Sequence, residues 1–115
     1  MYWAQATASA FLMLIQEECA EVAKPEWWND EELKALSARV VRAAPNYGRA
    51  NEMRALVLSG ILSAWEAGPR SAAELMEAAA HWERSAALTD APAVKAEKVL
   101  WAELCRREAA ECVSP

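Results

Sequence analysis

The sequence predicts an all-α fold, with a compact single domain over residues 1–115 that contains about five short helices. Three observations favour this class. Alanine is abundant and only three residues are glycine, which suits helices, whereas the β-branched residues typical of strands are sparse. Prolines recur at intervals of helical length, and apolar residues recur at helical spacing between them. A chain of 115 residues is expected to form one domain.

The first two helices are separated by a proline and a capping residue. We expect the first helix over residues 2–23, because the residue that precedes Pro25 avoids the α region. Asn29 has the character of an N-cap with Glu32 as its capping-box partner, and it begins a helix over residues 30–44. The apolar stripe of this second helix comprises Leu33, Leu36, Val40 and Val41.

The third helix is expected to be the central, buried one. It follows a turn at residues 45–48 and is predicted over residues 49–67, with Gly60 inside it to allow a close helix approach. Its apolar residues cover more than half of the helix circumference: Met53, Leu56, Val57, Leu58, Ile61, Leu62 and Trp65. Gly68 followed by Pro69 then stops any further helix.

Two further helices complete the chain. Ser71 and Glu74 form a second capping box, which begins a helix over residues 72–87. Pro92 suits the first turn of the last helix, which runs to about residue 111. The residues expected to face inward are Leu75, Ala79, Trp82 and Ala86 in the fourth helix, and Val94, Leu100, Trp101, Leu104 and Cys105 in the fifth.

The beginning of the chain carries no charge, because the first charged residue is Glu17. Six consecutive apolar residues, 10–15, point in every direction around a helix instead of along one stripe. A domain of this size has few places to bury such a helix on all sides. We therefore expect one side of the segment to meet its own fold and another side to meet a second chain, in a homodimer built mainly on this helix.

Tryptophan is the second sign of a contact surface, since the chain has six and tryptophan is enriched at the centres of protein interfaces. Trp27 and Trp28 are adjacent in a connection, so we expect that they do not both belong to the core. Trp28 has the alternative role of a hydrophobic staple on Leu33. The candidate interface residues are Tyr2, Trp3, Phe11, Leu12, Ile15, Trp27 and Trp28.

The charges are acidic overall and segregated along the chain. A net charge of −5 speaks against direct binding of nucleic acid, which needs a basic surface. Residues 17–32 are strongly acidic, and residues 33–54 are basic through Lys34, Arg39, Arg42, Arg49 and Arg54. Two interpretations remain open: adjacent helices neutralise each other across a shared groove, or the arginines form a patch for an acidic partner.

No motif for catalysis, metal binding or cofactor binding is present, so we expect neither an enzyme nor a metal or cofactor site. The single histidine, His81, is expected on an exposed helix face. Small helical chorismate mutases clamp their substrate with arginines, but the first helix here has no cation before Lys24. A helix-turn-helix is also excluded, because the helix that would recognise DNA, from Asn51 onward, is mostly apolar.

The three cysteines are expected to be free, buried thiols in a reducing cytoplasm. Cys105 and Cys112 lie seven residues apart on one helix, about 10 Å, which is too far for a disulfide. Cys19 is the third. The apolar run at residues 10–15 is too short to span a bilayer, and no basic segment precedes it as in an export signal. We therefore expect no membrane association.

The whole chain resembles the QslA family of small all-helical quorum-sensing anti-activators in bacteria. The resemblance rests on length, on the alanine- and tryptophan-rich composition, and on the apolar opening from Met1, Tyr2 and Trp3 to Ile15. It implies a dimer that binds the ligand-binding domain of a LuxR-type transcription regulator and blocks the regulator's dimerisation and DNA binding. The alternative is a structural, assembly or chaperone-like helical subunit of a phage or secretion system.

Overall fold

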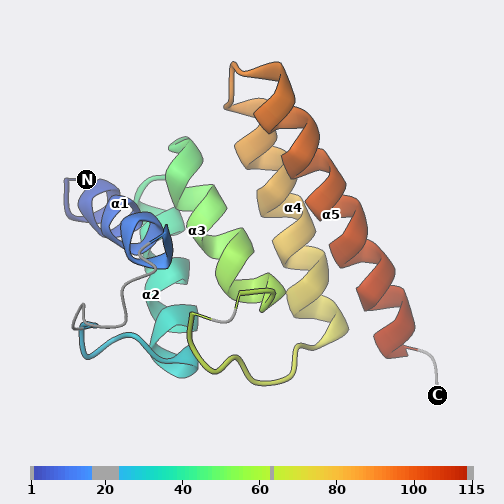
Figure 1. Cartoon of the computed structure of the whole chain (residues 1–115), viewed down its shortest axis with the longest axis horizontal. Coiled ribbons are helices and arrows are strands. Elements are labelled where there is room, and N and C mark those ends of the chain that lie inside the picture. The colour runs from blue at the N-terminus through green and yellow to red at the C-terminus, as the bar shows by residue number, and fades with distance from the viewer. Residues whose placement is uncertain (1, 17–23, 63, 114–115) are drawn as a thin grey trace.

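The chain is all-helical, as predicted. A computed structural model describes residues 2–16, 24–62 and 64–113, and over these residues the chain forms five helices and no strand. The helices are α1 (Tyr2–Gln16), α2 (Asp30–Ala43), α3 (Gly48–Ser59), α4 (Ala72–Ala87) and α5 (Pro92–Val113) (Figure 1). Residues 17–23, where the first helix was expected to continue, lie outside the described residues. None of the described helices combines the length and apolar character needed to cross a bilayer.

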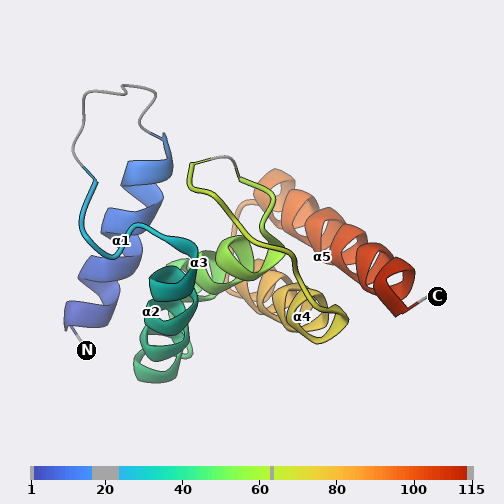
Figure 2. The same cartoon turned by 90° about the horizontal axis from the view of Figure 1, so that it is seen from below.

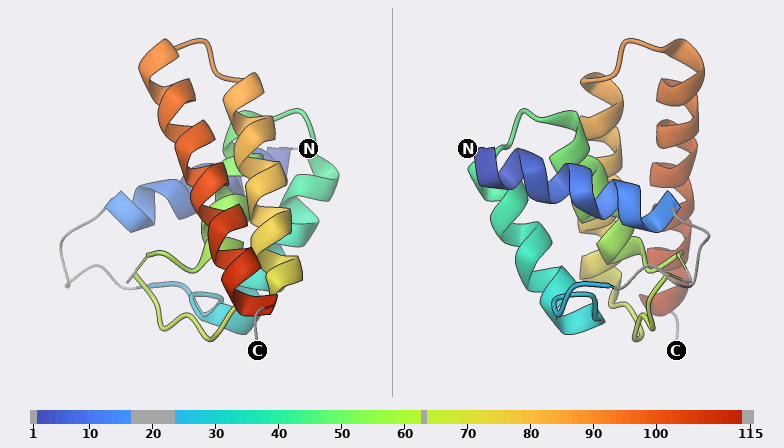
Figure 3. Two further views of the ribbon diagram at one scale, coloured as in Figure 1. Left: turned by 90° about the vertical axis from the view of Figure 1, so that its right-hand side faces the viewer. Right: turned by 60° about the vertical axis from the view of Figure 1, so that its left-hand side comes forward.

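The helices pack around α3. Seen from below, α3 lies between α1 and α2 on one side and the α4–α5 pair on the other (Figure 2). The α1 helix crosses α2 and α3, whereas α4 and α5 run side by side as an antiparallel pair (Figure 3). Because α5 packs principally on α4, α5 forms one edge of the molecule.

The central helix α3 is buried along almost its whole length, which confirms its predicted place. Its buried side chains are Ala50, Asn51, Met53, Ala55, Leu56, Val57, Leu58 and Ser59. The predicted end at residue 67 was wrong, because Gly60 does not lie inside the helix. It adopts a left-handed conformation with φ 62° and caps the C-terminus, and its N–H donates to the Leu56 carbonyl.

Capping chemistry fixes the starts of α2 and α4 where the sequence places them. The Asn29 side chain accepts a hydrogen bond from the backbone N–H of Glu32. Among the described residues the other half of the predicted capping box is not formed, because the Asn29 N–H donates to the Trp27 carbonyl instead of the Glu32 carboxylate. In α4 both halves of the capping box are present, since the Ser71 hydroxyl accepts from the Glu74 N–H and the Glu74 carboxylate accepts from the Ser71 N–H.

The inward face of α5 differs from the predicted one. Small side chains, Ala102, Cys105 and Ala109, are buried in α5, whereas Leu100 is 53% exposed and Val94 is also exposed. The small residues allow α5 to lie close to α4, so the larger apolar residues of α5 are left at the sides of the contact. Trp101 is half-buried, and its ring stacks on that of Trp82 with 6.4 Å between centroids.

Candidate protein-interaction surface

The two sides of α1 have different surroundings. The buried side chains Ala4, Ala8, Phe11 and Leu12 face the molecule's own core. We define the α1 outer face as Tyr2, Ala6, Ser9, Met13 and Gln16, which recur at alternating spacings of four and three residues and so share one side of the helix. Tyr2 is 89% exposed and Met13 is 65% exposed. No residue of α1 is charged.

Polar and basic groups border the α1 outer face. Trp3 is exposed beside it, and the guanidinium of Arg39 in α2 lies 5.5 Å from the Trp3 ring centroid, in cation–π contact. On the other flank, the Arg49 guanidinium donates to the Ser9 hydroxyl at 3.4 Å. An apolar centre with a polar rim is the usual anatomy of a protein interface.

Two of the predicted interface residues lie in the core instead. Phe11 is fully buried and Leu12 is only 9% exposed, so neither can contact a partner in this fold. The run of six apolar residues is divided by helical geometry, and Phe11 and Leu12 fall on the side that faces α2 and α3. Ile15 also packs against the core but is only half-buried, at the end of α1.

Trp28 takes part in an aromatic cluster beneath α1. Its ring centroid lies 5.4 Å from that of Phe11 and 6.0 Å from that of Trp65, and its indole N–H donates to the Ala64 carbonyl at 2.9 Å. Trp27 packs on the outside of Trp28, with 5.8 Å between centroids. Both tryptophans are half-buried. Because Trp28 contacts Phe11 of α1 and also Ala64, it helps to hold α1 to the connection that follows α3.

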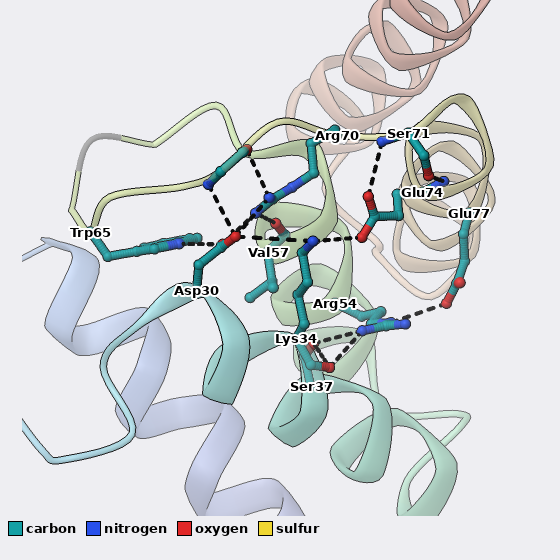
Figure 4. Close-up of polar contacts among 11 residues, drawn as sticks. Asp30, Lys34, Ser37, Arg54, Val57, Trp65, Arg70, Ser71, Glu74 and Glu77 are labelled. Carbon is teal, nitrogen blue, oxygen red and sulfur yellow. Dashed lines mark hydrogen bonds and ion pairs between the residues drawn. The ribbon is translucent and has the colours of Figure 1, made fainter. Parts of the chain in front are cut away.

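A polar cluster that the sequence analysis missed joins this connection to the start of α2 (Figure 4). The Asp30 carboxylate accepts from the Arg70 guanidinium at 2.6 and 2.9 Å, from the Trp65 indole N–H at 2.9 Å and from the Gly68 N–H at 3.0 Å. These bonds, that of Arg70 above all, hold the pKa of Asp30 well below its ordinary value. Arg70 also donates to the Val57 carbonyl at 2.8 Å, which satisfies the last turn of α3.

The remaining cations of this region are engaged with α4. Lys34 lies 2.7 Å from Glu74, and Arg54 lies 3.0 Å from Glu77 (Figure 4). Arg54 also donates to the Lys34 carbonyl and to the Ser37 hydroxyl. These contacts support neutralisation between adjacent helices. Arg39 and Arg49 contact Trp3 and Ser9 of α1, whereas Arg54 contacts Glu77 of α4, so these three arginines do not converge on one site.

His81 has a structural place and not the exposed one expected for it. Its Nδ1 lies 3.0 Å from the Asn51 side-chain oxygen, and its Nε2 lies 3.3 Å from the Glu77 carboxylate. Burial lowers the pKa of His81, and the Glu77 carboxylate opposes that effect. The imidazole, on α4, thus connects that helix to Asn51 of α3.

No group of three or more potential metal ligands occurs in the described part of the chain. Cys105 and Cys112 are free thiols, but only Cys105 is buried, and the predicted burial of Cys112 was wrong because it is exposed near the end of α5. Burial raises the pKa of Cys105. Cys19 lies outside the described residues.

An apolar groove beside α5 is the other surface that the sequence analysis missed. Val94 and Trp101 of α5 line it together with Ile61 and Leu62, which follow α3. Helical spacing assigned these residues to the interior, whereas Ile61 and Val94 are exposed and Leu62 and Trp101 are half-buried. Comparison of the chain with protein-family models, with curated proteins and with solved structures found no match.

Proposed function

We propose that this chain is a homodimeric, protein-binding anti-activator that acts in the bacterial cytoplasm on a LuxR-type quorum-sensing regulator. It binds the regulator's ligand-binding domain and covers the surface through which two regulator chains associate. The regulator then no longer dimerises or binds DNA. The observation that carries the homodimeric, protein-binding part of the proposal is the uncharged α1 outer face, with its exposed Tyr2 and Met13 and with Trp3 beside it.

The composition of this face is more typical of a surface in a permanent protein interface than of a surface exposed to water. A quarter of the chain's residues are charged, yet none of them lies in α1. Tyrosine, tryptophan and methionine are enriched in interfaces, where charged residues are depleted. Because each chain carries a net charge of −5, two copies repel each other except where an uncharged face lets them approach. We therefore assign the α1 outer face to the homodimer.

Competition supplies the mechanism. An acidic protein does not compete for DNA itself, so it has to act on the regulator. A protein that binds only the regulator monomer shifts the monomer–dimer equilibrium by mass action, and the shift grows with its concentration above Kd. The regulator's DNA affinity depends on its dimer, so loss of the dimer releases the DNA.

Fluorescence anisotropy of labelled operator DNA tests this function. A purified LuxR-type regulator is bound to the DNA, and the chain is then titrated in. We expect the anisotropy to fall to that of free DNA, with little dependence on salt because the contact is mainly apolar. Anisotropy that persists at excess protein would refute the regulatory function and favour the structural or assembly alternative.

A further inference from the structure

The groove beside α5 is lined mainly by apolar side chains. Leu56 and Trp82 are buried at its floor, and Ile61, Val94 and Trp101 stand along its sides. Its volume is about 440 Å³, which is within the range of pockets that hold a ligand or several side chains. Ile15 of α1 closes one side.

One side of α5 extends the groove along the helix. Val94, Glu97, Trp101, Leu104 and Glu108 recur at alternating spacings of three and four residues, which is the spacing of a helix–helix seam. The contact of α5 with α4 is made mainly on the adjacent side of α5, which includes the buried Ala102, Cys105 and Ala109, and Trp101 is the seam residue that also stacks on Trp82 of α4. The seam therefore lies beside this contact, and among the described helices only α4 packs extensively on α5.

The charges in and beside the groove point to a basic occupant. The Glu52 carboxylate is neutralised by Lys98 at 3.3 Å, and Lys98 is further held by the Ser85 and Thr89 hydroxyls. Within the described chain, Glu97 accepts only a long bond of 3.5 Å from the Trp101 indole N–H, and neither Glu97 nor Glu108 has an ion-pair partner. Two unpaired carboxylates thus lie in an otherwise apolar seam.

We propose that this groove docks an amphipathic helix of the partner protein, with apolar anchors three to four residues apart and a Lys or Arg that faces Glu97. Helices bind grooves in this manner through anchors on one face. The inference rests on the proposed function and assigns a place to its partner. Ile15 projects from the side of α1 opposite to Met13, so the groove and the α1 outer face can be occupied at the same time.

A charge swap with synthetic peptides tests the groove without a regulator. The probe is an 18-residue helical peptide with leucines on one face and lysines beside them, and its counterpart carries glutamates in place of the lysines. We expect the lysine peptide to bind the wild-type chain, with amide NMR shifts at α5. Glu97→Lys should weaken that binding about fivefold and strengthen binding of the glutamate peptide, as expected for one exposed charge pair.

Glu103→Lys is the matched control, because Glu103 is exposed on α5 away from the seam. It should leave both peptide affinities unchanged. Equal effects of the two substitutions, or NMR shifts confined to α1, would overturn the groove assignment. A change in sedimentation mass caused by Val94→Glu, at a residue that lines the groove, would instead identify a second copy of the chain as the occupant, and would also overturn it.

The operator-DNA assay separates this inference from the proposed function. If the wild-type chain releases the regulator and Val94→Glu does not, while both remain dimers, the groove holds the partner. If Val94→Glu releases the regulator as well as the wild type does, the groove assignment fails and the function stands. If the wild type itself does not act, the function fails, and the peptide experiment alone decides the groove.

Discussion

At the scale of single residues, Asp30 holds the connection after α3 in place. Its carboxylate neutralises Arg70, whose side chain is only 6% exposed. We expect Asp30→Asn to lower the free energy of unfolding by about 3 kcal/mol, because the substitution leaves a buried guanidinium without its counter-charge. Urea unfolding measures the change. Glu31→Gln is the control, since Glu31 is exposed in the same first turn and should cost well under about 1 kcal/mol. Equal losses in the two variants would contradict the role of Asp30.

The Asp30 carboxylate also makes the free energy of unfolding depend on pH. Because the pKa of Asp30 is held below its ordinary 3.8 in the folded chain, the unfolded chain takes up the proton first as the pH falls. The contribution of Asp30 is complete above its unfolded pKa and is lost at lower pH. Between about pH 5 and about pH 3 the wild type should therefore lose more stability than Asp30→Asn. Parallel stability curves for the two proteins would show that Asp30 is not the group responsible.

At the scale of elements, Gly60 ends α3. Its φ of 62° is unfavourable for any other residue, and an added Cβ would lie 3.2 Å from Arg70 Nε. Gly60→Ala should cost about 1–2 kcal/mol, measured by thermal or urea unfolding. Gly48→Ala is the matched control. Gly48 lies in the first turn of α3, and a Cβ added there would make an ordinary contact of 3.7 Å with the Leu88 side chain. A stable Gly60→Ala protein would contradict the capping role.

The element boundaries show which structural information is local. Asn29 and Ser71 fix the starts of α2 and α4 from within a few residues, so the sequence predicts them correctly. The end of α3 was missed because apolar residues continue at helical spacing beyond Gly60. The helix ends there with help from Arg70, which binds the Val57 carbonyl from 13 residues away. A contact of that kind is not visible in local spacing.

At the scale of the whole molecule, the sequence predicts that α1 is divided between two environments but not where the division falls. Phe11 and Leu12 face the core, whereas Tyr2 and Met13 face outward. A run of consecutive apolar residues has no stripe from which to read its inward side. The α5 seam was missed for the opposite reason, since its large apolar residues, such as Val94, were assigned to a core that is built there from alanine and cysteine.

The central claim is that the α1 outer face joins two copies of this chain, and sedimentation equilibrium at micromolar concentration tests it most directly. We expect the wild type to sediment at twice the chain mass of 12.7 kDa. Met13→Glu should sediment as a monomer, because the substitution places a charge in an apolar contact. Met76→Glu is the matched control: Met76 is 49% exposed on α4, and this variant should remain a dimer. A wild-type protein that sediments at 12.7 kDa would contradict the account.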